Sequence, residues 1–227
     1  MSMRLANCER LTRCAFAAPI ALAAAAIVLA AGCGAARPSK YYQLTVPGDM
    51  AAPANSSAYP ITMVVGALTS SALYRDDHIV YGTSGEQMGT YEYQKWAEPP
   101  TEMLHDVLLR ALRGSGHYRG VYSLRSTVRG DYLLRGRLYD FKEVPGNAGN
   151  ALLARVTLDL ELRDEKSGAI VWTHFYSFDQ PVNGKDVAAV VAALDQNVQR
   201  GLAQILASLD QYFAAHPPAP PADKPAN

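Results

Sequence analysis

The chain has 227 residues, of which 49% are hydrophobic, and its 21 lysines and arginines balance 21 aspartates and glutamates. A formal net charge of zero gives no indication of nucleic-acid binding, which needs clustered positive charge. Length and apolar content fit one globular domain of ordinary size.

The N-terminal segment has the layout of a secretory signal peptide. Three arginines precede a nearly uncharged, alanine-rich run at 15–31, and small residues lead from its end to Cys33. A cysteine at the cut site is typical of a bacterial lipoprotein signal. We therefore expect residues 1–32 to be removed and Cys33 to carry a lipid, with palmitate among its acyl chains. The alternative is an uncleaved helical anchor, but the run lies at the short limit for crossing a bilayer and contains Pro19.

Removal of the leader would change the cysteine content and the charge of the chain. Cys8 and Cys14 would leave with it, so the mature monomer would contain neither a disulfide nor a free thiol nucleophile. The remaining 18 basic and 20 acidic side chains nearly balance, so the mature chain would carry only a small net charge. The predicted organisation is a signal peptide at 1–32, a lipidated cysteine and tether at 33–40, a single folded domain at 41–214 and a disordered Pro/Ala-rich tail at 215–227.

The first half of the mature chain predicts short strands followed by a helix. The strand candidates are 41–46, 61–68, 79–81 and 89–93, with a loop at 47–60 and a turn at 82–85. Apolar residues at three- and four-residue steps from Met103 to Leu112 then predict an amphipathic helix. Pro99 and Pro100 fit its first turn, where no N–H is needed, and Gly114 is placed to end it.

Residues 131–179 predict a three-stranded meander. From Val156 to Leu162 apolar and polar residues alternate strictly, which is typical of a half-buried antiparallel strand. The segment 131–141 behaves similarly, and a hairpin at 164–168 leads to a returning strand. On one side of that returning strand we expect Ile170, Trp172, His174, Tyr176 and Phe178.

A long helix follows the meander. Asp186 is a candidate N-cap, and apolar residues recur at helical spacing from Val190 to Phe213. This helix would lie across the sheet, and its face could also pack against other copies of the chain. The fold class predicted is α+β, a mostly antiparallel sheet with two main helices packed on it, in one domain.

Catalytic motifs are not found in the sequence. It has neither a nucleophile-elbow Gly-x-Ser-x-Gly nor a lysine-bearing phosphate loop, and its five histidines are scattered without metal-ligand spacing. His105 and Asp106 are adjacent on a predicted helix, so their side chains point in different directions. We expect no enzyme activity, metal or cofactor; a hydrolase would need a deep pocket with convergent polar groups.

One motif carries a family resemblance. It comprises Ile79-Val80-Tyr81, then Met88-Gly89-Thr90-Tyr91-Glu92-Tyr93, then Trp96-Ala97-Glu98-Pro99-Pro100, and it accompanies an early strand with Tyr41, Tyr42 and Leu44. With the lipoprotein signal, these residues resemble the auxiliary lipoprotein component of ABC-type transport systems, of the paraquat-inducible protein C type. The candidate partner-binding or motif residues are Tyr42, Leu44, Tyr91, Tyr93, Trp96, Glu98 and Pro99.

The motif also has a purely structural interpretation. Trp96 ends a strand just before a helix, where a large ring can close the sheet–helix junction. Glu98 would lie at the positive end of the helix dipole, and Pro99 would fix the angle at which the chain enters the helix. We favour this structural role for Trp96 and Pro99.

The resemblance implies a role in lipid traffic across the bacterial envelope. An inner-membrane ABC transporter would work with a periplasmic MCE protein, and this lipoprotein would dock the MCE protein from the outer membrane, facing the periplasm. Gly34 is compatible with outer-membrane sorting because the usual retention signal at that position is aspartate. The resemblance also implies a homo-oligomeric ring of this chain, since some relatives assemble as rings. The alternative function is a lipoprotein partner or chaperone of another envelope machine, for lipopolysaccharide or polysaccharide export.

Overall fold

The computed structural model describes residues 37–45, 59–83, 86–146 and 151–218. The predicted signal peptide, Cys33 and most of the tether lie outside these ranges, as do most of the loop at 47–60 and the tail after Pro218, so these assignments stay predictions. The chain divides into two compact units, Met1–Pro38 and Ser39–Asn227, and the fold described below is that of the second.

The second unit is α+β, as predicted. Its described residues form the strands β1 (Lys40–Tyr42), β2 (Tyr59–Ser70), β3 (His78–Gly82), β4 (Met88–Trp96), β5 (Tyr118–Ser123), β6 (Tyr132–Pro145), β7 (Leu152–Asp164) and β8 (Ile170–Pro181). The helices are α2 (Pro100–Gly114), α3 (Val187–Ala215) and a short 3-10 turn, Ala72–Tyr74. The predicted meander corresponds to β6, β7 and β8, and both predicted helices are present.

Strand β6 is the centre of the sheet. Strand β7 pairs with it antiparallel along its whole length, from Tyr132 to Pro145, and β8 pairs antiparallel with β7. The other edge of β6 is shared: β2 pairs with its first half and β3 with its second half, both in parallel. A register shift between Leu138 and Asp140 lies between the two partners. The sheet order on that side is β1-β4-β3-β6-β2-β5.

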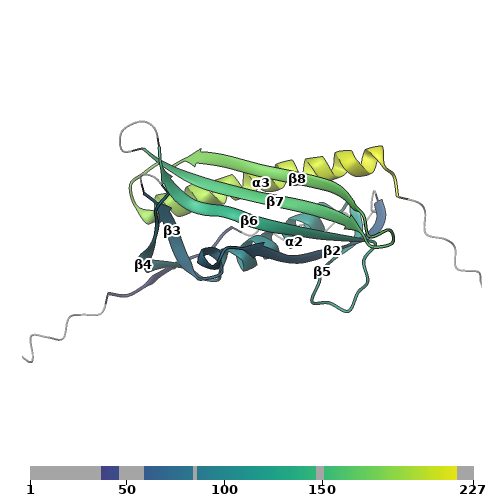
Figure 1. The fold of residues 1–227 in the computed structure, drawn as a ribbon, viewed down its shortest axis with the longest axis horizontal. Helices are drawn as coiled ribbons and strands as arrows, with labels where there is room; N and C mark the ends of the chain where they lie inside the picture. Colours follow the sequence, from purple (N-terminus) through teal and green to yellow (C-terminus); the bar gives the residue numbers. More distant parts are fainter. Residues whose placement is uncertain (1–36, 46–58, 84–85, 147–150, 219–227) are drawn as a thin grey trace, which may run out of the picture. The chain divides into compact units, whose positions relative to one another are not determined.

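The core lies between the sheet and the two helices. Helix α2 contacts β2 and β5, and α3 contacts β7 and β8. Both helices lie behind the sheet in the view of Figure 1. The alternating leucines Leu158, Leu160 and Leu162 are buried on this side because period-2 alternation directs them to one face. Among the described helices, none has the length and apolar character needed to cross a bilayer.

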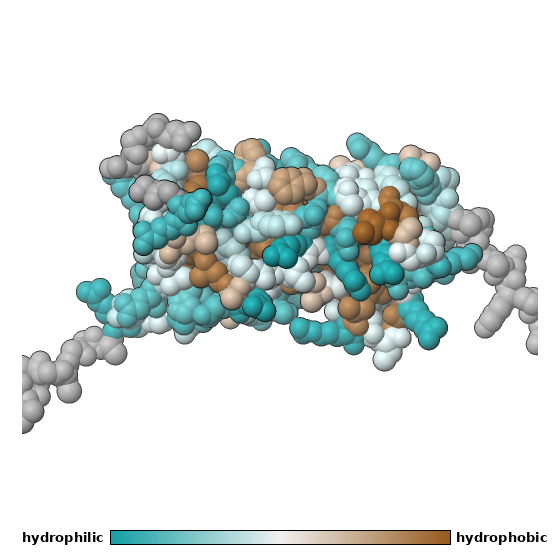
Figure 2. Space-filling model, in the orientation of Figure 1, coloured by the Kyte–Doolittle hydropathy of each residue, from teal (hydrophilic) through white to brown (hydrophobic). Residues whose placement is uncertain are grey.

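Among the described residues, no helix covers the opposite face of the sheet. Figure 2 looks onto this face, where hydrophilic and intermediate residues predominate and hydrophobic residues gather in separate spots. Its charged side chains include Arg135, Arg137, Asp159 and Glu161, which the alternation assigns to the side away from the core. We call it the open face.

The helix ends follow the sequence with one correction. Asp186 caps α3, accepting a hydrogen bond from the backbone N–H of Ala189 at 2.9 Å. Pro99 is the N-cap of α2 and Pro100 its first residue. Helix α2 ends at Gly114, as predicted. The glycine with the left-handed backbone conformation that often follows a helix is, however, Gly116, with a φ of 67°.

Three features of the sheet were not predicted. Strand β5 is short and contains Gly120, so its sequence gives only a weak strand signal. The parallel pairings join segments far apart in the chain, which local periodicity does not encode. Ile170 was expected beside Trp172, but it is 55% exposed, because the register of β7 and β8 shifts between Leu162 and Arg163.

Candidate functional site

The motif around Trp96 forms a buried corner. The Trp96 side chain is fully buried and its ring lies 5.3 Å from that of Phe141 in β6. Its backbone N–H donates to the carbonyl of Asp77 at 2.6 Å, and the next N–H, of Ala97, donates to the carbonyl of Tyr42, also at 2.6 Å. Trp96 therefore closes the junction between β1, β4 and the start of α2.

Tyr42 and Leu44 belong to the same corner. The Tyr42 hydroxyl donates to the side-chain oxygen of Gln94 at 2.9 Å, and Leu44 is buried. The chain then contacts α3, because the N–H of Thr45 donates to a carboxylate oxygen of Asp195 at 2.9 Å. These two predicted residues thus hold the N-terminal strand on the domain.

Pro99 and Glu98 define the start of α2. The Pro99 carbonyl accepts from the N–H groups of Glu102 at 2.9 Å and Met103 at 3.1 Å, which begins the helical hydrogen bonding. Glu98 precedes the cap and is exposed. It lies at the positive end of the helix, where a carboxylate is favoured.

Tyr91 and Tyr93 have different surroundings although they are two residues apart. The Tyr91 hydroxyl donates to Glu143 Oε2 at 2.8 Å, and its ring packs 4.9 Å from that of Tyr81. Burial, and then the bond to Glu143, raise the pKa of Tyr91. Tyr93 is 37% exposed. The seven predicted residues therefore do not form one surface: five are structural contacts, and only Tyr93 and Glu98 are open to a partner.

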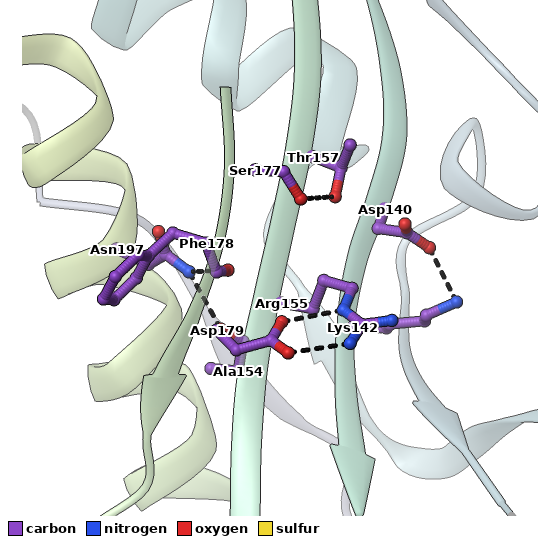
Figure 3. Close-up of polar contacts among 9 residues, drawn as sticks. All are labelled: Asp140, Lys142, Ala154, Arg155, Thr157, Ser177, Phe178, Asp179 and Asn197. Atoms are coloured by element: carbon purple, nitrogen blue, oxygen red, sulfur yellow. Dashed lines mark hydrogen bonds and ion pairs between the residues drawn. The ribbon is translucent and has the colours of Figure 1, made fainter. Parts of the chain in front are cut away.

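A second candidate surface lies on the open face. Arg155 of β7 makes a bidentate ion pair with Asp179 of β8, with both N–O distances 2.7 Å, and Lys142 lies 2.6 Å from Asp140 on β6 (Figure 3). The bond to Arg155 lowers the pKa of Asp179. A hydrogen bond of 3.0 Å joins the hydroxyls of Thr157 and Ser177 beside these ion pairs. These contacts fix the open face as a rigid polar platform.

Two aromatic rings extend from this platform into solvent. Phe175 is 65% exposed and Tyr139 is 47% exposed. Phe175 is directly opposite Asp159 in the register, and Asp159 is opposite Arg137, whose guanidinium lies 5.3 Å from the centre of the Tyr139 ring. Sequence reasoning missed Phe175, although alternation places this aromatic residue on the solvent side of its strand.

Two hollows among the described residues differ in size and lining. An apolar cavity between α2, α3 and β7, lined in part by Leu104, Leu158 and Leu202, has a volume of about 20 Å³, which is room for about one water molecule. A wider surface depression of about 1020 Å³ lies beside the β5–β6 loop, but Arg129 and Glu165 are among the charges of both signs that line it. Neither selects an acyl chain in this conformation.

Two of the histidines form structural contacts with other elements. His105 is buried with Nδ1 3.1 Å from the carbonyl oxygen of Gly66, and His117 Nδ1 lies 2.7 Å from Asp210 Oδ1. Among the described residues, His78, Asp76 and Asp77 bring possible metal ligands within 4.8 Å of one another. The ammonium of Lys95 lies 3.2 Å from Asp77. This ion pair accounts for the acidic side chains of the turn without a metal ion.

The fold places this protein in the class of two-layer α+β domains, in which helices cover one face of a sheet and leave the other face open. The chain belongs to the family of ABC-type transport auxiliary lipoprotein components, whose family model matches residues 42–206. The family resemblance drawn from the sequence is thereby confirmed. The comparison with curated proteins gives no match.

Solved structures share the fold, and two of them serve as examples. A crystal structure of a Xanthomonas campestris protein of the DUF330 family has a TM-score of 0.68 at 20% identity, covering 78% of this chain and 99% of that one. A crystal structure of an uncharacterized protein has a TM-score of 0.60 at 15% identity, covering 76% of this chain and 99% of that one. At these identities the likeness concerns the fold alone.

Proposed function

We propose that this protein is a lipid-anchored, non-catalytic subunit of an ABC/MCE-type lipid transport system of the bacterial envelope. The family match over residues 42–206 is the observation that carries the proposal. Acylated Cys33 would hold the domain at the outer membrane, facing the periplasm, since two or more acyl chains anchor stably where one does not. The domain would act by binding an MCE protein rather than by chemistry.

The open face is the surface best suited to that partner. Phe175 and Tyr139 are exposed aromatic rings of the kind that dominate binding energy when they enter a partner's pockets. Arg137 and Asp159 beside them supply a charged rim that favours one orientation of the partner. The paired strands beneath make the surface rigid, so little conformational entropy is lost when a partner docks.

Capture of partners from detergent-solubilised membranes tests both parts of the proposal. The native protein should recover an MCE protein and components of its ABC transporter. Phe175→Ser should reduce that recovery at least tenfold, because it removes the most exposed aromatic anchor. Ile170→Ser is the matched control, since it removes an exposed apolar side chain from the start of the same strand.

Two results would contradict the proposal. Failure of the native protein to recover any MCE protein in several detergents would remove the transport assignment, and recovery of a lipopolysaccharide or polysaccharide export component would support the alternative function. Equal recovery by Phe175→Ser and the native chain would instead remove only the open face as the docking surface.

A further inference from the structure

The N-terminal strand β1 is the described element that lies nearest in sequence to Cys33. Seven residues lead from Cys33 to Lys40, and a fully extended chain spans at most about 3.6 Å per residue, or about 25 Å here. If Cys33 is acylated as proposed above, this length holds β1 and its neighbour β4 close to the bilayer surface. Strand β1 is the purple strand next to β4 in Figure 1.

Two exposed tyrosines lie in this part of the sheet, one on β1 and one on β4. The parallel register pairs Tyr41 with Lys95 and Tyr42 with Trp96. Successive side chains of a strand alternate between faces, so Tyr41 and Lys95 share the face opposite to buried Trp96. Tyr93 lies two residues before Lys95, where the register of β3 and β4 shifts. Tyr41 is 64% exposed and Tyr93 is 37% exposed.

The charges around the two tyrosines nearly cancel. Lys40 is an exposed cation and Glu92 is an exposed anion, while Lys95 is paired with Asp77. This environment does not select a strongly charged partner. It suits the headgroup layer of a membrane, where amphipathic tyrosine rings concentrate at the boundary between water and hydrocarbon.

We propose that Tyr41 and Tyr93 contact the phospholipid headgroups of the membrane that holds Cys33, and thereby set the orientation of the domain on that membrane. The inference depends on the acylation of Cys33 in the proposed function. With a single flexible attachment the domain could rotate freely, whereas a second contact through β1 and β4 limits it to one orientation.

The cysteine content of the chain permits a direct test. Acylation of Cys33 and loss of Cys8 and Cys14 with the leader would leave the mature protein with no free thiol, so one introduced cysteine is labelled uniquely. The full-length chain is expressed, and processed Tyr41→Cys, Tyr93→Cys and Phe175→Cys proteins are spin-labelled in vesicles of phosphatidylethanolamine and phosphatidylglycerol. Accessibility of each label to oxygen, which concentrates in lipid, and to a water-soluble nickel complex is then measured.

We expect labels at positions 41 and 93 to show at least a threefold higher ratio of oxygen to nickel accessibility than the label at 175, with little change at high salt. The full-length chain with Tyr41→Ser and Tyr93→Ser combined, labelled through Ser39→Cys, should show faster tumbling on vesicles than the same label with both tyrosines present.

Three outcomes would overturn the inference. Equal accessibility ratios at 41, 93 and 175 would show that the tyrosines face water. Protection of both tyrosine positions from oxygen and nickel together would show that protein, such as a second copy, covers them. Mass spectrometry that finds an unmodified Cys33 would overturn the proposed anchoring, and this inference with it, so the two failures are distinguishable.

Discussion

The side-chain amide of Asn197 in α3 donates a hydrogen bond of 2.8 Å to the backbone carbonyl of Ala154 in β7. The same amide donates to the carbonyl of Phe178 in β8 at 2.8 Å, as Figure 3 shows, and its oxygen accepts from the hydroxyl of Tyr176 at 2.6 Å. Asn197 is completely buried. A fully bonded polar group in an apolar interface fixes one axial position of the helix on the sheet, because any sliding would leave it unsatisfied.

Replacement of Asn197 should therefore be costly. We expect Asn197→Ala to lower the free energy of unfolding by about 2–4 kcal/mol, since it opens a cavity and leaves the Tyr176 hydroxyl without its side-chain acceptor. Urea denaturation measures the change. The control is Gln204→Ala on the exposed side of the same helix, which should change stability by less than about 0.5 kcal/mol. A similar small change for Asn197→Ala would contradict the anchoring role.

Trp96 should affect folding and leave partner recognition unchanged. Trp96→Ala should cost about 3–5 kcal/mol because the ring is fully buried. Trp96→Phe should cost much less, since the indole N–H has no hydrogen-bond partner among the described residues and its loss leaves nothing unsatisfied. Thermal unfolding measures both. If folded Trp96→Phe protein lost its partner in the capture assay, the motif would be a binding element after all.

The Arg155–Asp179 pair should make the free energy of unfolding fall as the pH is lowered. Because the folded state lowers the pKa of Asp179 from its usual value of 3.8, the pair contributes stability above that pH, and the contribution is lost as pH falls through the folded-state value. Both side chains are about one-third exposed, so the contribution is about 0.5–1 kcal/mol.

Asp179→Asn is the variant that isolates this effect. Its difference in unfolding free energy from the native protein should be constant from about pH 7 to 5 and should shrink below about pH 4. Chemical denaturation at several pH values measures it. A difference that stays the same at pH 3, or grows there, would show that Asp179 is not the stabilising carboxylate.

The anchor prediction concerns Cys33 and Gly34. Cys33→Ser should leave the domain folded but release it from membranes, because acylation would be lost. Gly34→Asp should keep the lipid and shift the protein from the outer-membrane to the inner-membrane fraction on a density gradient. Cys33→Ser protein that stays membrane-bound after a high-salt wash would indicate that the run at 15–31 remains as a helical anchor.

The candidate site was only partly predictable from the sequence. Trp96 and Pro99 were expected as a structural corner, and the structure places them in one. Tyr91 and Tyr93 looked equivalent in sequence, yet one bonds to Glu143 on β6 and the other is open, because a neighbouring strand covers only the first. Alternation places Phe175 on the solvent side of its strand, but only the tertiary structure brings Asp159 and Arg137 of the neighbouring strands onto the same face.

The sequence by itself determined the elements whose signal is local. Strict alternation from Val156 to Leu162 gave a half-buried strand, and helical spacing after the Asp186 cap gave a long helix, because side-chain periodicity and capping involve neighbours in the chain. Only the tertiary structure decided that β2 and β3 share one edge of β6, and that Asn197 fixes α3 against β7 and β8. Those relationships join residues far apart in sequence, where hydrogen-bond geometry and packing, rather than any local pattern, select the partner.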